Sequence, residues 1–156
     1  MPHPLEPLTA AEVSRAVSTL AAAGKLTPST RVVSVMLKEP PKAAVHAGTG
    51  WNELPREAAA VLFDNATNSS YEAELNLTKE AVTAFKHVPG VQPTMTIDEQ
   101  VECEQAVLNS PEFAAALKRH YGEVDPKLVM VDIWSAGYYG NAEEKGMRLA
   151  RPLCFM

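Results

Sequence analysis

The side chains that could hold a metal ion are few and scattered in this sequence. Four histidines occur, far apart from one another: His3, His46, His87 and His120. They form no His-x-His or His-Glu-x-x-His pattern, and the two cysteines, Cys103 and Cys154, form no Cys-x-x-Cys pair. Because a metal site needs several such ligands at close spacing, the sequence predicts no metal site. The two cysteines are interpreted as buried, reduced thiols.

Acid–base and nucleophilic chemistry has equally little support. Glu72 with Glu74, and Glu143 with Glu144, are carboxylate pairs, but each fits a solvated strand face or loop better than a general acid and base. No glycine-rich phosphate loop and no serine or cysteine in a nucleophile-elbow pattern occurs. The residues alone therefore predict that this chain carries no catalytic centre.

One segment stands out, the sequence VDIWSAGYYG at residues 131–140. A strand-like apolar run ends at Trp134, and a small Ser-Ala-Gly stretch then leads to Tyr138 and Tyr139. A large, flat indole at the end of a strand can narrow an apolar channel, or it can seal the core of its own domain. Both interpretations are open at this point.

Composition excludes several classes of protein. The 156 residues are 46% apolar and 21% charged, with a formal net charge of −5, which is ordinary for a globular protein. Lysine and arginine cluster nowhere, so a nucleic-acid partner is not expected. No apolar run approaches the roughly 20 residues that cross a membrane, so no membrane partner is expected either. The N-terminus lacks the features of a secretory signal, which favours an intracellular protein, cytoplasmic or peroxisomal.

The elements that must position these side chains follow one order in the first half. Thr9 and Glu12 form a capping box, and the spacing of Val13 to Leu20 predicts a helix that Gly24 ends. An irregular stretch, 39–55, separates a predicted strand from three more. The four predicted strands are 31–38, 58–64, 71–77 and 81–88, and together they favour an antiparallel meander.

The same order begins again in the second half. Thr96 and Glu99 form another capping box, ahead of a predicted helix whose apolar face holds Ile97, Val101 and Leu108. A second short helix is expected to pack His120 on its apolar side. Two predicted strands follow, 128–134 and 148–156. The repeat predicts an α+β fold of two units, each a helix on an antiparallel sheet: 1–90, and 91–156 with its sheet incomplete.

Several phrases, in order, resemble the N-terminal region of copper amine oxidases, particularly the microbial and fungal ones. These phrases are HPLEPLTAAEV at the start, EPPK at 39–42, LFDNATNSSYEAELNL at 62–77, HVPGVQPTMT at 87–96, LVMVDIWSAG at 128–137 and RLARPLCF at 148–155. The resemblance covers essentially the whole chain. It implies two cystatin-like α+β domains that precede a large catalytic β-sandwich domain.

The resemblance also implies a function for the parent enzyme. Such enzymes form homodimers and use copper and topaquinone, made from a tyrosine in an Asn-Tyr-Asp/Glu setting, to convert primary amines into aldehyde, ammonia and hydrogen peroxide. None of the four tyrosines of this chain follows an asparagine. The chain is therefore expected to be inactive alone, to bind neither cofactor, and to have the missing catalytic domain as its partner.

Channel residues follow from the resemblance as well. The strand end at Asp132, Ile133 and Trp134 corresponds to an edge that lines the route of the amine, and Gln100 corresponds to a position near the channel mouth, where some relatives have an aromatic residue. The alternative function is a stand-alone cystatin-like binding module without activity. The Gln-x-Val-x-Gly hairpin of cystatin-type inhibitors is absent, however.

Overall fold

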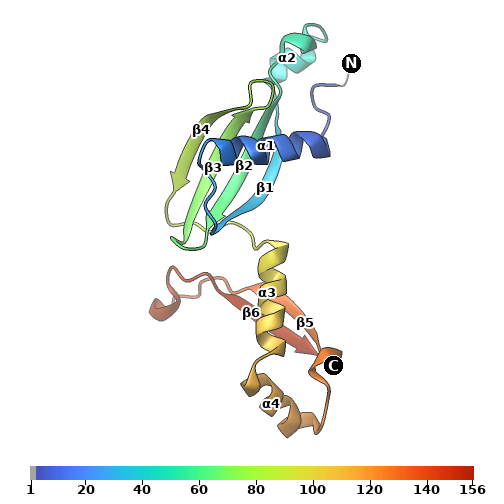
Figure 1. Cartoon of the computed structure of the whole chain (residues 1–156), viewed down its shortest axis with the longest axis vertical. Coiled ribbons are helices and arrows are strands. Elements are labelled where there is room, and N and C mark those ends of the chain that lie inside the picture. Colours follow the sequence, from blue (N-terminus) through green and yellow to red (C-terminus); the bar gives the residue numbers. More distant parts are fainter. Residues whose placement is uncertain (1–2) are drawn as a thin grey trace. The chain divides into compact units, whose positions relative to one another are not determined.

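The computed structural model describes residues 3–156. The chain divides into two compact units, Met1–Pro93 and Thr94–Met156, called here the first and the second unit. Each consists of helix packed on antiparallel sheet (Figure 1). The predicted α+β class is confirmed, and the likeness of each unit to a cystatin stays a prediction.

The first unit packs one long helix on a four-stranded sheet. Helix α1 (Ala10–Ala22) begins at the capping box of Thr9 and Glu12. The sheet has the order β1-β2-β3-β4 with antiparallel neighbours throughout, which is the predicted meander. Its strands are β1 (Thr30–Lys38), β2 (Glu57–Asp64), β3 (Ser69–Asn76) and β4 (Ala81–Val88).

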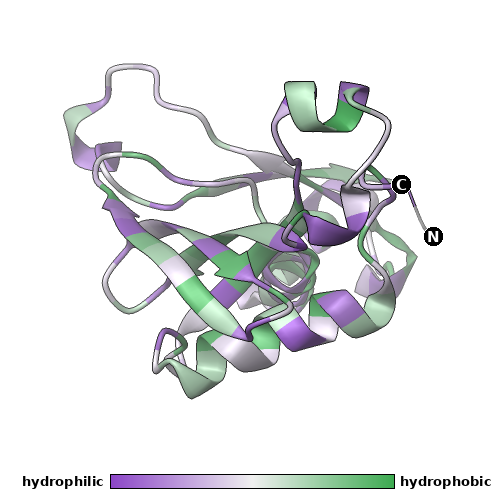
Figure 2. Cartoon of the chain, turned by 90° about the horizontal axis from the view of Figure 1, so that it is seen from above, coloured by the Kyte–Doolittle hydropathy of each residue, from purple (hydrophilic) through white to green (hydrophobic). Residues whose placement is uncertain are grey.

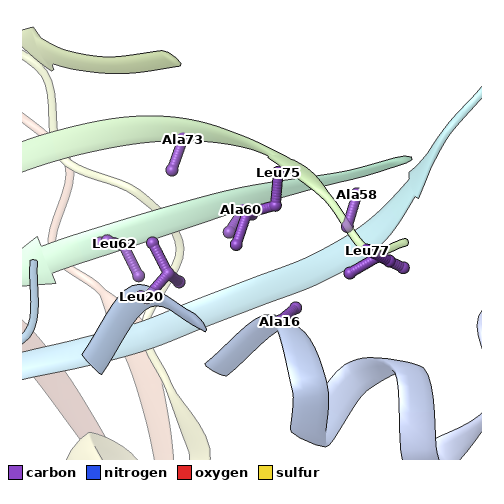
Figure 3. Close-up of a cluster of buried hydrophobic side chains, with 8 residues drawn as sticks. All are labelled: Ala16, Leu20, Ala58, Ala60, Leu62, Ala73, Leu75 and Leu77. Atoms are coloured by element: carbon purple, nitrogen blue, oxygen red, sulfur yellow. The ribbon is translucent and has the colours of Figure 1, made fainter. Parts of the chain in front are cut away.

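In Figure 1, α1 lies across the four-stranded sheet, and the core of the first unit lies between them. Ala16 and Leu20 of α1 are fully buried, and they face alternate residues of the central strands (Figure 3). The sheet side of this core consists of Ala58, Ala60, Leu62, Ala73 and Leu75 from the strands and of Leu77, directly after β3. The small alanines let the helix approach the sheet closely, so the leucines fill the remaining space.

The second unit has two helices and a two-stranded sheet. Helix α3 (Ile97–Leu108) begins at the second capping box, and α4 (Pro111–Tyr121) begins at Ser110, whose hydroxyl accepts from the Phe113 N–H. Strands β5 (Met130–Ser135) and β6 (Ala150–Phe155) pair antiparallel, and α3 packs on both. Short 3₁₀ turns precede each strand, at Pro126–Leu128 and Ala142–Glu144.

The two faces of the β5–β6 pair differ in exposure along β5. Val131 is buried and Ile133 half-buried, which places them on the side that α3 covers. The opposite side, called here the open face, is exposed at every position. Its residues are Met130, Asp132 and Trp134 from β5 and, opposite them, Phe155, Leu153 and Arg151 from β6.

The outer edge of β6 carries a proline. The Ala136 N–H donates to the Leu149 carbonyl, which makes these two residues a hydrogen-bonded pair. In an antiparallel ladder, hydrogen-bonded and non-hydrogen-bonded pairs alternate from there on. Pro152, opposite Ile133, then falls at a position whose backbone groups point away from β5. Since proline has no N–H, the middle donor of that edge is missing.

Several predictions about single segments are wrong. The stretch 39–55, expected to be irregular, contains helix α2 (Lys42–His46) and a 3₁₀ turn, Trp51–Glu53. Ile97 and Val101 are 77% and 51% exposed, because α3 turns its other side to the sheet.

Two side chains expected to be buried are not. His120 is exposed at the end of α4, where its ring lies 6.3 Å from that of Tyr121. Cys154 is exposed and Cys103 only half-buried, and both thiols are free. Partial burial raises the pKa of Cys103, which makes it a poor nucleophile.

Candidate functional site

The most strongly perturbed carboxyl group of the first unit, Glu12, serves the fold. Its Oε2 accepts from the Thr9 N–H at 2.8 Å, and the Arg56 guanidinium donates to its Oε1 at 2.7 Å. The pKa of Glu12 falls to about 2, chiefly because of the hydrogen bond from Arg56. Arg56 also donates to the carbonyls of Glu6 and Pro7, so one side chain fixes both the start of α1 and the segment before it.

The second unit repeats this arrangement. Glu99 accepts from the Thr96 N–H at 2.8 Å and receives two hydrogen bonds from Arg148, of 2.5 and 2.8 Å. The hydrogen bond from Arg148 is the main reason that the pKa of Glu99 lies at about 2. Arg148 also donates to the Thr94 carbonyl. In both units, then, the capping-box glutamate is held by an arginine from a distant segment, and a perturbed pKa marks a structural ion pair.

A third lowered pKa has the same kind of cause. The carboxylate of Asp64, at the end of β2, accepts from the Ser29 hydroxyl at 2.9 Å, from Thr27, and from the backbone N–H groups of Ala66 and Thr67. The Ser29 hydrogen bond contributes most to lowering this pKa. Asp64 ties the turn before β1 to the turn after β2, so this carboxylate too is structural.

The open face of the second unit brings together two of the four predicted channel residues. The Trp134 indole N–H donates to Asp132 Oδ2 at 2.7 Å, and the Trp134 side chain is 59% exposed. Both lie on the same side of β5, because residues two apart on a strand share a face. An oriented carboxylate thus stands beside a large apolar ring, open to solvent.

The other two predicted channel residues lie elsewhere in the second unit. Ile133 points to the opposite face of β5, toward α3, where it is half-buried. Gln100 is exposed on α3, the helix that covers that same face. The structure therefore groups Asp132 with Trp134 and separates them from Ile133 and Gln100.

Three residues of the open face were not anticipated from the sequence. Met130, Leu153 and Phe155 are 60%, 46% and 50% exposed, and they alternate with residues of the covered face. The alternation of residues 148–156 could have shown this, had the pairing with β5 been known. Arg151, opposite Trp134, donates to both carboxylate oxygens of Glu144 at 3.2 and 3.0 Å.

Two classes of site find no support among residues 3–156. No group of three or more histidine, cysteine or acidic residues within that range is arranged to hold a metal ion. None of its helices is long and apolar enough to span a membrane. Hydrophobic and hydrophilic residues instead intermingle along the ribbon (Figure 2).

Comparison with known families decides what this arrangement belongs to. Residues 9–84 match the model of the AGAO-like N2 domain, and residues 98–156 match that of the copper amine oxidase N3 domain. The chain belongs to the copper amine oxidase family. It is the N-terminal domain region of such an oxidase, and the resemblance seen in the sequence is confirmed.

Curated relatives agree with this assignment. A primary amine oxidase of Arthrobacter sp. (strain P1) is 40% identical over 155 residues, which is 99% of this chain and 23% of the relative. N-methylputrescine oxidase 1, peroxisomal, of Nicotiana tabacum is 35% identical over 98% of this chain and 24% of its own length. The copper amine oxidase region described here thus spans about a quarter of these relatives.

A solved structure shows the same fold. The copper-containing benzylamine oxidase of Hansenula polymorpha matches with a TM-score of 0.68 at 20% identity, over 87% of this chain and 22% of that one. At this identity the likeness supports the architecture of the copper amine oxidase N-terminal region and nothing finer.

Proposed function

We propose that this chain is the non-catalytic N-terminal region of a copper-containing primary-amine oxidase. The intact enzyme would convert primary amines into aldehyde, ammonia and hydrogen peroxide. The observation that carries the proposal is the succession of two copper amine oxidase domains along one chain, at residues 9–84 and 98–156. The name of the Arthrobacter relative, a primary amine oxidase, supports the reaction.

Copper and topaquinone belong, in this proposal, to the rest of the parent enzyme. The residues present do not fit either group: residues 3–156 offer no cluster of metal ligands, and no tyrosine follows an asparagine. No step of the oxidation is therefore assigned to side chains of this chain. The chain is expected to release no peroxide by itself.

The role proposed for the chain is to pack on the catalytic β-sandwich domain and to wall part of the amine channel. The open face of β5 and β6 supports this role, because Met130, Trp134, Leu153 and Phe155 expose an apolar surface that is unfavourable in water. Trp134 and Asp132 are proposed as channel-lining residues on this face. Ile133 and Gln100 are retained as further lining candidates from α3 and the covered side of β5.

Other properties of the parent follow from the family. The proposed enzyme is a homodimer whose dimer contacts rest chiefly on the catalytic domain. An intracellular location, cytoplasmic or peroxisomal, is proposed. The word peroxisomal in the names of two Nicotiana tabacum relatives supports it. The cystatin-like character of both units is part of the same proposal.

The test has two parts. The coding DNA is sequenced past the codon for Met156, where an oxidase requires a tyrosine in an Asn-Tyr-Asp/Glu setting and a His-x-His pair. Peroxide release with benzylamine and with methylamine is then compared for the 156-residue chain and for the protein that the longer frame encodes, with and without added copper.

Activity of the longer protein alone supports the proposal. A stop codon directly after Met156, together with a single cooperative unfolding transition of the chain, would favour a stand-alone binding module instead. Peroxide release by the 156-residue chain above a no-protein control would contradict its non-catalytic role.

A further inference from the structure

The sheet of the first unit ends at β4, and part of the backbone of this strand faces outward. The Leu77 N–H donates to the Arg56 carbonyl, which makes these two residues a hydrogen-bonded pair of the β2–β3 ladder. Because such pairs alternate, the even-numbered residues of β3 turn their backbone groups toward β4. Their partners include Ala84, Lys86 and Val88. The backbone groups of Phe85 and His87 therefore point away from the sheet.

A groove of about 510 Å³ runs beside this edge, and its volume is within the roughly 300–1,000 Å³ typical of ligand sites. One wall is the start of β4, from Ala81 to Phe85, and the other is the end of α1 with Ala22, Ala23 and Lys25. Figure 1 shows α1 lying across the sheet and β4 at its edge. Domains that add an extended peptide to a sheet use an exposed strand edge in the same way, and neighbouring pockets read alternate side chains.

No proline blocks this edge. The sequence of β4, Ala81–Val88, contains none, in contrast to β6, where Pro152 removes the middle donor. The one irregularity is a bulge that leaves Thr83 without a partner in β3. From Ala84 to Val88 the pairing with β3 is regular, so this part of the edge can accept a further strand.

Lys25 gives the groove a positive charge that no acid of the first unit balances. Its Nζ lies 4.8 Å from the centroid of the Phe85 ring. No aspartate or glutamate among residues 3–156 lies within ion-pair distance of it. Glu80, the acid of the groove, lies 3.6 Å from Arg15 instead. A carboxylate placed opposite Phe85 would therefore meet an unpaired ammonium.

The same charges disfavour a second copy of the chain as the occupant. Antiparallel pairing of two β4 edges about Phe85 would bring the two Lys25 ammonium groups together on one face. It would also bring the exposed Lys86 of each chain close to that of the other on the opposite face. Like charges on facing strands are destabilising, whereas an acidic peptide meets no such repulsion.

We propose that the β4 edge and the groove beside it bind an extended, acidic peptide segment of a partner protein. The peptide pairs antiparallel with Ala84–Val88, and its acidic residue stands opposite Phe85 and meets Lys25. Small apolar residues two positions before and after the acid share its face, and the later one lies in the groove. The site belongs to the first unit alone, so it does not depend on the reaction of the parent enzyme.

The test follows the backbone amide signals of the ¹⁵N-labelled 156-residue chain as the synthetic peptide acetyl-Val-Thr-Glu-Thr-Val-Thr-amide is added. In an extended peptide of this sequence the glutamate and both valines share one face. The amides of Phe85 and His87 are expected to shift, together with those at the end of α1. Strand β1 is the opposite edge of the same sheet, so its amides serve as an internal control and should not shift.

Two N-methylated peptides distinguish strand pairing from simple apolar contact without changing the protein. Cross-strand partners share a face, so the valine and glutamate N–H groups are the ones that face β4. Methyl groups on these nitrogens should weaken binding about tenfold, the loss expected for two backbone hydrogen bonds. Methyl groups on the threonine nitrogens point to solvent and should change the affinity by less than about threefold.

The charge of the partner is tested with two variants of the chain. Lys25→Gln should weaken binding of the glutamate peptide about threefold, as expected for an exposed ion pair. Lys42→Gln removes the same charge from α2, outside the groove, and is the matched control that should leave the affinity unchanged. A Lys25→Gln variant that binds as tightly as the wild type would overturn the acidic character proposed for the partner.

Three other results would overturn the proposal. The first is the absence of any β4 shift at millimolar peptide, or shifts in β1 as large as those in β4. The second is equal affinity of the two methylated peptides. The third is a set of β4 shifts that grow with protein concentration when no peptide is present, because a second copy would then occupy the edge.

Discussion

The two units use the same device at the start of their main helices and then differ in what the helix covers. Thr9 and Glu12 with Arg56, and Thr96 and Glu99 with Arg148, form matching capping boxes with an added ion pair. In the first unit the helix then covers four strands and seals a leucine-rich core. In the second unit it covers two strands, whose other face stays exposed.

This difference shows that a well-capped helix does not by itself make a core. The side chain pairs at the two helix starts are nearly interchangeable, whereas burial depends on how much sheet lies beneath the helix. Ala16 and Leu20 of α1 are fully buried, whereas Ile97 and Val101 stay exposed because they lie on the side of α3 that faces away from the sheet. The first unit should therefore depend on core packing, and the second unit more on its ion pair and cap.

The largest effect is expected from the core of the first unit. Leu20→Ala should lower its free energy of unfolding by about 3 kcal/mol, because a fully buried leucine leaves a cavity. Val101→Ala, at an exposed position of α3, should change the stability of the second unit by less than about 0.5 kcal/mol. Amide hydrogen exchange in β2 and in β5 measures the two units separately. Similar losses for both variants would show that α3 buries more than the structure indicates.

The ion pairs should have the next largest effect, and one that depends on pH. Glu12→Gln and Glu99→Gln keep the capping box but remove the charge, so each should cost its unit about 1–2 kcal/mol at pH 7, less than a fully buried pair because solvent reaches both side chains. The pKa of each glutamate is lowered from 4.5 to about 2. The stabilisation is therefore complete above pH 4.5 and is lost as the pH falls through about 2.

Urea unfolding at several values between pH 2 and pH 7 measures this dependence for the wild-type chain and both variants. Each variant should show a flatter acid dependence in its own unit and an unchanged one in the other. We expect Glu99→Gln to remove a larger fraction of the second unit's free energy of unfolding than Glu12→Gln removes from that of the first unit. Equal fractions would contradict the inference that the second unit depends more on its ion pair.

The caps should have a smaller effect. Thr9→Ala and Thr96→Ala remove the hydroxyls that accept from the Glu12 and Glu99 N–H groups, and each should cost about 1 kcal/mol. Thr9→Ser and Thr96→Ser keep the hydroxyl and serve as controls. Thermal unfolding followed by circular dichroism gives the ranking. Serine variants as unstable as the alanine variants would assign the loss to the threonine methyl group.

The smallest effect concerns the outer edge of β6. Pro152→Val restores a backbone donor on that edge, so the variant should associate more readily with itself at high concentration. Sedimentation velocity at increasing concentration measures this. Pro152→Ala also restores the donor, but alanine has a lower strand propensity than valine. Its tendency to self-associate should therefore lie between those of Pro152→Val and the wild type. No change for either would show that the proline does not limit pairing at this edge.

Local signals in the sequence predicted much of the fold. Both capping boxes and all the strands were recognised, because caps depend on residues three apart and strands on a short alternation. The antiparallel order of β2, β3 and β4 followed from their short connections, whereas the long stretch 39–55 joins β1 to β2. Helix α2 was missed, because five residues between prolines and glycines carry too little periodicity to be recognised.

Long-range features could not be predicted in the same way. The partners of Glu12 and Glu99 lie 44 and 49 residues away, and no local pattern announces them. The grouping of Asp132 with Trp134 follows from the two-residue repeat of a strand, but the family resemblance alone had placed Ile133 and Gln100 beside them. Knowing which side of β5 is covered by α3 is what separates Ile133 and Gln100 from Asp132 and Trp134.

The ion pair between a helix start and a distant arginine also has a consequence for the order of folding. Glu12 completes its cap locally, within one helical turn, but it meets Arg56 only after β1 and the segment that follows it have returned to the helix. Closing a loop of this length costs conformational entropy before any contact is gained. The contact between Glu12 and Arg56 should thus form late, so its removal should speed unfolding and leave the refolding rate nearly unchanged.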